Sequence, residues 1–143
     1  MQPLAAPFPA TRFRRLRRTP ALRALVREST LSPDDLIWPI FIREGEGVAE
    51  PIASMPGVER LSVDRAVAAA REAVSLGIPV IALFPYTEAA SKTPGAEEAW
   101  NPENLVNRAT RAIKDEVPGV AVMLDVALDP YNSDGHDGLV QDG

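Results

Sequence analysis

The sequence predicts an α/β fold in which strands and helices alternate along a parallel sheet. Three apolar segments, at residues 36–42, 78–85 and 120–128, have the length and content of buried strands. Two segments between them carry apolar residues at helical spacing. This alternation is typical of right-handed crossovers between parallel strands. Three strands with two helices leave one sheet face largely uncovered, so we expect residues 36–143 to be the first part of a larger, truncated barrel.

Residues 1–35 are predicted to form an N-terminal arm with one short helix. The first eleven residues hold three prolines and no hydrophobic period. Thr19 followed by Pro20 is a typical helix start, and the apolar stripe that follows predicts a helix ending near Ser29. Pro33, preceded by a serine, repeats the start signal for about one turn.

The first strand and first helix are separated by polar sequence. Within residues 36–42, Pro39 lacks an N–H and indicates a strand start, a bulge or an edge. Residues 43–51 are acidic and contain glycine, which predicts a loop, and residues 54–58 predict a turn. Ser62 is then expected to cap a helix that Gly77 closes.

The second helix and the third strand complete the pattern. Asn101 and Pro102 predict the helix start, and the helix should stop before Pro118. Residues 120–128 then form an apolar run that suits a parallel strand covered on both faces. Asp125 interrupts this run, and a carboxylate inside an apolar strand is costly unless it is paired or functional.

An acidic loop follows this strand and is the first candidate for function. It carries four titratable side chains, namely Asp129, Asp134, His136 and Asp137. In β/α barrels, chemistry is done at the C-terminal ends of the strands. Strand alternation puts positions 125, 127 and 129 on one face, and the loop can bring Asp137 back over it. The alternative is a solvated Asp/Gly turn, with His136 as a solvated loop residue.

Charge is distributed unevenly along the chain, whose net charge is −5. Residues 1–28 carry seven arginines and one glutamate, +6, so the remainder carries −11. A basic arm of this kind binds either nucleic acid or an acidic sister subunit. We favour the subunit, because Phe8, Leu16 and other apolar residues interleave with the arginines.

Composition excludes several classes of protein. There is no cysteine, so the chain has neither disulfides nor a thiolate metal site. No apolar run approaches the ~20 residues of a membrane span, and no signal peptide is recognisable at the N-terminus. The sequence therefore predicts a cytoplasmic protein without a membrane partner.

Several motifs together resemble the porphobilinogen synthase (delta-aminolevulinic acid dehydratase) family. The resemblance extends over nearly the whole chain, and its most specific elements are MPGVxR and DVALDP. The matching segments are residues 14–18, 22–28, 36–41, 54–61, 77–79, 82–85, 125–130 and 135–138. The family fold is a (β/α)8 TIM barrel with an N-terminal arm that wraps a neighbouring subunit, usually in a homo-octamer. The resemblance thus implies an arm, residues 1–35, and three of the eight β/α units, residues 36–143.

The resemblance also implies an activity. The family is a lyase of heme biosynthesis that condenses two 5-aminolevulinate molecules to porphobilinogen and forms Schiff bases on two lysines. Neither Lys92 nor Lys114 matches the catalytic lysine positions, which fall beyond residue 143. The 143-residue chain alone is therefore expected to be inactive.

The carboxylates are the part of the site that the chain carries. By resemblance, Asp125 positions the substrate amine, and Asp129 and Asp137 position substrate or a cation. Many relatives hold zinc with three cysteines at the positions of Ala127, Asp129 and Asp137, so catalytic zinc is not expected here. A metal held by Asp129 and Asp137 would be a hard cation such as Mg²⁺, or a monovalent cation. Asp134 stands where many relatives have His.

Two other classes of function stay open. The chain could be a non-catalytic assembly or binding module built from the same fold, or a nucleic-acid binder acting through its arginine arm. Agreement of the motifs ranks porphobilinogen synthase first, the assembly module second and the nucleic-acid binder third.

Overall fold

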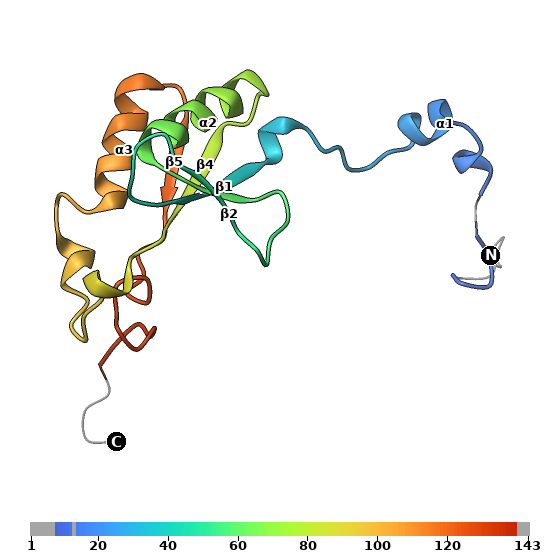
Figure 1. The fold of residues 1–143 in the computed structure, drawn as a ribbon. Coiled ribbons are helices and arrows are strands. Elements are labelled where there is room, and N and C mark those ends of the chain that lie inside the picture. Colours follow the sequence, from blue (N-terminus) through green and yellow to red (C-terminus); the bar gives the residue numbers. More distant parts are fainter. Residues whose placement is uncertain (1–7, 13, 140–143) are drawn as a thin grey trace. The chain divides into compact units, whose positions relative to one another are not determined.

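The computed structural model describes residues 8–12 and 14–139 (Figure 1). Contacts divide the chain into one unit up to Leu31 and a second from Ser32. The first unit contains helix α1 (Pro20–Leu25), preceded by a 3₁₀ turn. The Thr19 hydroxyl accepts the N–H of Leu22 at 3.2 Å, which confirms the predicted cap. The helix ends at Leu25, before the predicted Ser29.

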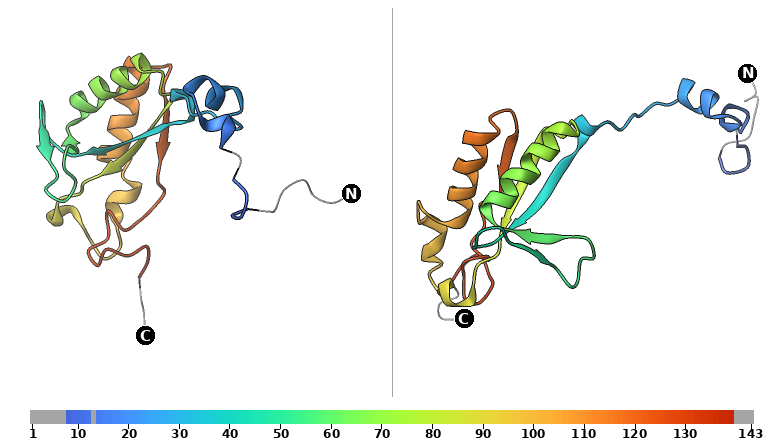
Figure 2. Two further views of the ribbon diagram at one scale, coloured as in Figure 1. Left: turned by 90° about the vertical axis from the view of Figure 1, so that its right-hand side faces the viewer. Right: turned by 45° about the horizontal axis from the view of Figure 1, so that its top comes forward.

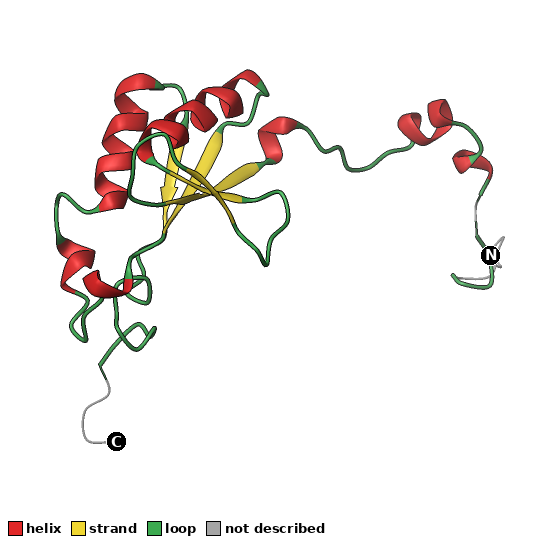
Figure 3. Cartoon of the chain, viewed as in Figure 1, coloured by secondary structure: helices red, strands yellow, loops and turns green. Residues whose placement is uncertain are grey.

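The second unit is built on a five-stranded sheet of order β2-β3-β1-β4-β5. Figure 3 shows the strands in yellow. Strands β1 (Ile37–Ile42), β4 (Val80–Pro85) and β5 (Ala121–Leu124) run parallel. The first two agree with the strands predicted from the sequence. The predicted third strand, residues 120–128, is too long, because β5 ends at Leu124, which is opposite Leu83 of β4.

Two short strands were not predicted. Strand β2 (Ala49–Pro51) pairs antiparallel with β3 (Glu59–Leu61), and β3 pairs parallel with the end of β1. The sequence predicts a loop for residues 43–51, so this prediction is wrong for Ala49–Pro51. Each strand has only three residues and a mixed polar composition, so neither shows a strand period. Their pairing depends on β1, which supplies the partner for β3 at Phe41 and Ile42.

Helices α2 (Val63–Ser75) and α3 (Leu105–Glu116) cover one face of the sheet (Figure 2). The core between the helices and the sheet contains the fully buried side chains of Ile42, Ile81 and Ile113. Each such side chain contributes about 1.5–3 kcal/mol by leaving water. Both helices were predicted, but the cap of α3 is Asn104, whose side chain accepts the N–H of Asn107 at 2.8 Å, and not Asn101.

The opposite face of the sheet carries exposed apolar side chains. Phe41 and Phe84 pack together with their ring centroids 5.8 Å apart, yet Phe84 is 36% exposed and Met123 is 47% exposed. The expectation that β5 is covered on both faces is therefore wrong for the part of the chain described here. In that part β5 pairs only with β4, so it is an edge strand. None of the helices in residues 8–12 and 14–139 is long and apolar enough to cross a membrane.

Candidate active site at the C-terminal edge of the parallel strands

Three loops leave the sheet at one edge, because β1, β4 and β5 are parallel. Ile42 at the end of β1 lies opposite Pro85 at the end of β4, and Leu83 lies opposite Leu124. The loops that follow span residues 43–48, 86–104 and 125–139. In folds of this type, that edge is where ligands are bound and chemistry takes place.

Asp125 is the first residue after β5. Its side chain is exposed, and the next residue, Val126, is fully exposed. The pairing of β5 with β4 ends at Leu124, so residues 125–129 lie beyond the paired strand. That Asp125, Ala127 and Asp129 share one face stays a prediction.

The acidic loop, defined here as residues 125–139, is closed by Asp137. One oxygen of this carboxylate, Oδ1, accepts the N–H of Leu128 at 2.7 Å and the N–H of Asp129 at 3.0 Å. The loop thus does bring Asp137 back to Asp129, through backbone hydrogen bonds. Charge-assisted bonds of this type are stronger than bonds between neutral groups. The carboxylate of Asp129 itself is exposed.

The remaining polar residues of this loop have separate roles. The N–H of Asp134 donates to the side-chain oxygen of Asn132 at 2.7 Å. Gly135 has a φ of 71°, a value that L side chains rarely adopt, and this turns the chain. His136 is exposed.

By resemblance to the family, a catalytic zinc ion would lie at Ala127, Asp129 and Asp137. The Ala127 methyl group cannot coordinate a metal, and Oδ1 of Asp137 is occupied by two amides. Zinc in proteins takes three or four strong N, S or carboxylate ligands, so these residues do not fit it. Within residues 8–12 and 14–139, no group of three His, Cys, Asp or Glu side chains is placed to hold a metal ion. The assignment of a hard cation to Asp129 and Asp137 stays a prediction.

A connection between two of the loops was not visible in the sequence. Thr93, in the loop after β4, donates its N–H to Tyr131 O at 3.1 Å and accepts the N–H of Ser133 at 3.0 Å. The side chain of Asn132 donates to Pro94 O at 2.8 Å. Asn132 is only 2% exposed, although it lies in a polar turn sequence. The serine, asparagine and glycine residues of this loop gave only a general turn signal.

A cluster of charged side chains around Tyr86 was also not predicted from the sequence. Tyr86 follows β4 directly, and the guanidinium groups of Arg60 and Arg43 lie 4.4 and 6.0 Å from its ring centroid. Glu50 pairs with both arginines, and Glu88 lies 3.5 Å from Arg43. Cation–π contacts of this kind contribute about 0.5–2 kcal/mol. The cluster joins β2, β3 and the ends of β1 and β4.

Tyr131 belongs to the acidic loop and is buried, with 7% of its surface exposed. Burial raises the pKa of its hydroxyl, and the negative charge of Glu98 adds to the rise. The tyrosine lines a small pocket with Glu98, Tyr86, Glu88 and other residues of the same sheet edge. The hydroxyl therefore stays protonated at neutral pH and can donate a hydrogen bond in this pocket.

Two lysines occur in the sequence, and neither has the place of a Schiff-base nucleophile. Lys114 donates to Pro118 O at 2.8 Å and to Val120 O at 2.7 Å. It satisfies carbonyl groups after the end of α3, at the N-terminal side of β5. Lys92 is half-buried in the loop after β4, not at the end of a strand.

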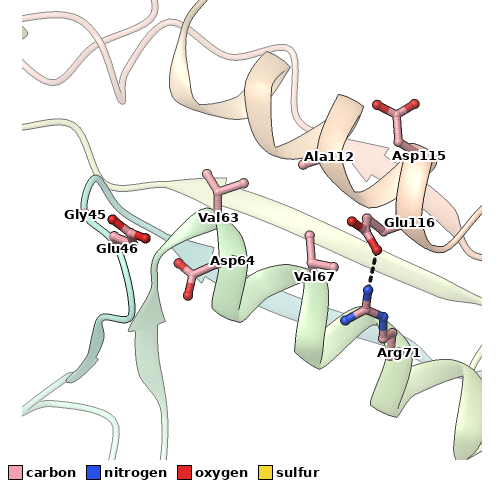
Figure 4. Close-up of a pocket in the computed structure, with 9 residues that line it drawn as sticks. All are labelled: Gly45, Glu46, Val63, Asp64, Val67, Arg71, Ala112, Asp115 and Glu116. Atoms are coloured by element: carbon pink, nitrogen blue, oxygen red, sulfur yellow. Dashed lines mark hydrogen bonds and ion pairs between the residues drawn. The ribbon is translucent and has the colours of Figure 1, made fainter.

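A larger pocket lies elsewhere, between α2, α3 and the loop after β1 (Figure 4). Its volume is about 640 Å³, and Arg71 of α2 pairs with Glu116 of α3 across it. The hydroxyl of Ser62 and the N–H of Gly47 lower the pKa of Asp64 at its rim. No residue of the acidic loop lines this pocket, so we do not assign the candidate site to it.

Comparison with known proteins shows the family of the chain. The family model for delta-aminolevulinic acid dehydratase matches residues 10–143. The chain belongs to the delta-aminolevulinic acid dehydratase family. Residues of the match include the whole acidic loop and all strands of the sheet.

Individual relatives are similar over nearly the whole chain. The delta-aminolevulinic acid dehydratase of Bradyrhizobium diazoefficiens is 56% identical over 134 residues, which are 94% of this chain and 38% of that protein. The Rhodobacter capsulatus protein is 51% identical over 140 residues, 98% of this chain and 42% of the relative. The chain thus spans about two fifths of the length of these relatives.

A solved structure of the family has the same fold over these residues. It is the Toxoplasma gondii delta-aminolevulinic acid dehydratase in complex with the reaction product porphobilinogen. The TM-score is 0.85 at 44% sequence identity, and the match covers 92% of this chain and 37% of the other.

Proposed function

We propose that this chain supplies the N-terminal arm and the first three β/α units of a (β/α)8 TIM barrel that forms porphobilinogen. The parallel strands, the two helices on one face and the bare opposite face support this role, because a closed barrel covers that face with its remaining strands. Similarity to 37% of the Toxoplasma gondii structure supports the same conclusion. The observation that carries the proposal is the acidic loop at the C-terminal edge of a sheet whose sequence matches the family from residue 10 to 143.

The proposed reaction condenses two molecules of 5-aminolevulinate with loss of two waters. The Schiff-base lysines come from sequence outside these 143 residues, since Lys114 is bonded to carbonyl groups at the other end of the sheet. Nucleophilic lysines require a lowered pKa, which burial or a second cation provides.

The acidic loop is proposed to bind the cationic part of the substrate. Asp125 and Asp129 lie in the loop that follows β5, at the sheet edge where substrate is proposed to bind, and both are exposed. Either carboxylate can accept hydrogen bonds from an ammonium group. Asp137 acts in the same site, with one of its oxygens bonded to the loop backbone.

By resemblance, the site works without zinc, either with no metal or with a hard cation. If a cation binds between Asp129 and Asp137, their oxygen ligands favour Mg²⁺ or a monovalent cation over zinc. Such an ion would neutralise the carboxylates and orient substrate oxygens.

The arm is proposed to bind a second copy of the chain in a homo-oligomer, by resemblance an octamer. Phe8, Leu16 and Leu25 are exposed within the arm unit, at 78%, 47% and 80%. These apolar side chains interleave with arginines, and the remainder of the chain is acidic. The predicted cytoplasmic location stays a prediction, since some relatives are chloroplastic.

The proposal is tested by measuring porphobilinogen formation from 5-aminolevulinate in two samples. The protein encoded by the complete reading frame should form porphobilinogen, and borohydride should trap the substrate on a lysine. The purified 143-residue chain should do neither. Turnover by the short chain alone would contradict the assignment of the lysines, and a complete protein without turnover or trapping would contradict the proposed activity.

A further inference from the structure

Asn132 is a buried polar residue in the middle of the acidic loop. It is 2% exposed, and both ends of its amide are bonded, Nδ2 to Pro94 O at 2.8 Å and Oδ1 to the N–H of Asp134 at 2.7 Å. Removing a buried partner leaves the other group unsatisfied, which costs more than the bond itself contributes. Asn132 is therefore expected to matter for the loop although it carries no charge.

The bond to Pro94 is part of a connection between two successive β/α loops. Thr93 forms a parallel bridge with Asn132, through the bonds of Thr93 to Tyr131 and Ser133. Three hydrogen bonds thus join residues 93–94 to residues 131–133, and only one of them uses a side chain. That side chain is the contact a substitution can remove while the backbone bonds remain possible.

The same turn is joined to the candidate carboxylates. The N–H groups of Tyr131 and Asn132 both donate to Leu128 O at 2.9 Å. The N–H groups of Leu128 and Asp129 are in turn bonded to Asp137. Asn132 therefore connects the loop after β4 to the part of the acidic loop in which Asp137 is bonded to the backbone of Asp129.

We propose that Asn132 is a positioning residue that holds Asp129 and Asp137 in place by fastening the acidic loop to the loop after β4. Together with the bonds that Asp137 makes to the backbone, this fastening closes the loop. The role in substrate binding rests on the proposed function, whereas the fastening itself does not.

The first test is hydrogen exchange measured by mass spectrometry on the complete protein. Asn132→Ala should speed exchange in the peptide covering residues 125–139 by about tenfold, since local opening then costs less. Exchange in the β4 peptide should stay unchanged.

Ser133→Ala is the matched control, because the backbone bond of Ser133 to Thr93 does not need its hydroxyl. Asn132→Asp keeps the acceptor for Asp134 and loses the donor to Pro94, so it should also speed exchange if the alanine variant fails to fold.

The second test separates positioning from stability. In the complete protein, Asn132→Ala should raise KM for 5-aminolevulinate about tenfold while kcat changes less than about threefold, and Ser133→Ala should change neither. Wild-type exchange in both Asn132 variants would overturn the fastening, and faster exchange with an unchanged KM would overturn the positioning role. A complete protein that forms no porphobilinogen would contradict the proposed function, and the exchange result would still decide the fastening.

Discussion

At the residue scale, Asp129 and Asp137 have different environments although both belong to the candidate site. Both residues are exposed, and the carboxylate of Asp137 in addition accepts two backbone N–H groups. Asp129→Ala should therefore raise the substrate concentration that the complete protein requires, with a change in unfolding free energy below about 0.5 kcal/mol. Substrate titration and urea denaturation of the same variant check both values. A destabilisation larger than the loss of substrate binding would contradict the assignment.

Asp137→Ala should, in contrast, lower the free energy of unfolding clearly. Loss of two hydrogen bonds to a carboxylate should cost roughly 1–2 kcal/mol, reduced by the exposure of the loop. The comparison with Asp134→Ala is the control, because Asp134 contributes only its N–H to the described bonds. Equal urea midpoints for the two variants would show that Asp137 does not close the loop.

Asp64 gives a prediction for pH. Its folded-state pKa is lowered, first by the Ser62 hydroxyl and then by the Gly47 N–H. A lowered pKa stabilises the fold above the ordinary value of about 3.8 and loses this contribution as pH falls through the folded value. Asp64→Asn should therefore lower the urea midpoint at pH 7 and have little effect at about pH 2. Equal effects at both pH values would contradict this origin.

At the element scale, local signals predicted most of the fold. Strands β1 and β4 have continuous apolar runs, and α2 and α3 have helical spacing, so each was identified without knowledge of its partners. The sequence predicts a longer third strand than β5, because residues up to Leu128 are apolar apart from Asp125, whereas the pairing ends at Leu124. Strands β2 and β3 exist only through pairing with each other and with β1. The bridge from Thr93 to Asn132 joins residues far apart in sequence, which no local pattern reveals.

The start of α3 offers a test at this scale. Asn104 is 3% exposed, accepts the N–H of Asn107 and donates to Glu98 O and Ala99 O. Asn104→Ala should cost about 2 kcal/mol, because a cap and a buried bonding group are lost together. Asn101→Ala, at the start predicted from the sequence, should cost clearly less. Denaturant midpoints of the two variants compare them directly, and a larger effect at Asn101 would contradict the capping assignment.

For the second unit as a whole, the uncovered sheet face and the edge of β5 predict association. Phe84, Met123 and Val126 are exposed at 36%, 47% and 100%. Exposed apolar faces and open strand edges bind other chains. The 143-residue chain should bind a hydrophobic dye and associate, and Met123→Lys should reduce both. A monodisperse monomer that does not increase the fluorescence of the dye would contradict the incomplete-barrel proposal.

The central proposal is that the acidic loop serves porphobilinogen formation without zinc. It rests on Ala127, which cannot bind a metal, and on Asp137, whose oxygen is bonded to Leu128 and Asp129. The most direct measurement is porphobilinogen formation by the complete protein in the presence of a strong zinc chelator. The account predicts that activity is kept at the level of the untreated protein. Activity that is lost in the chelator and restored by stoichiometric zinc would contradict it.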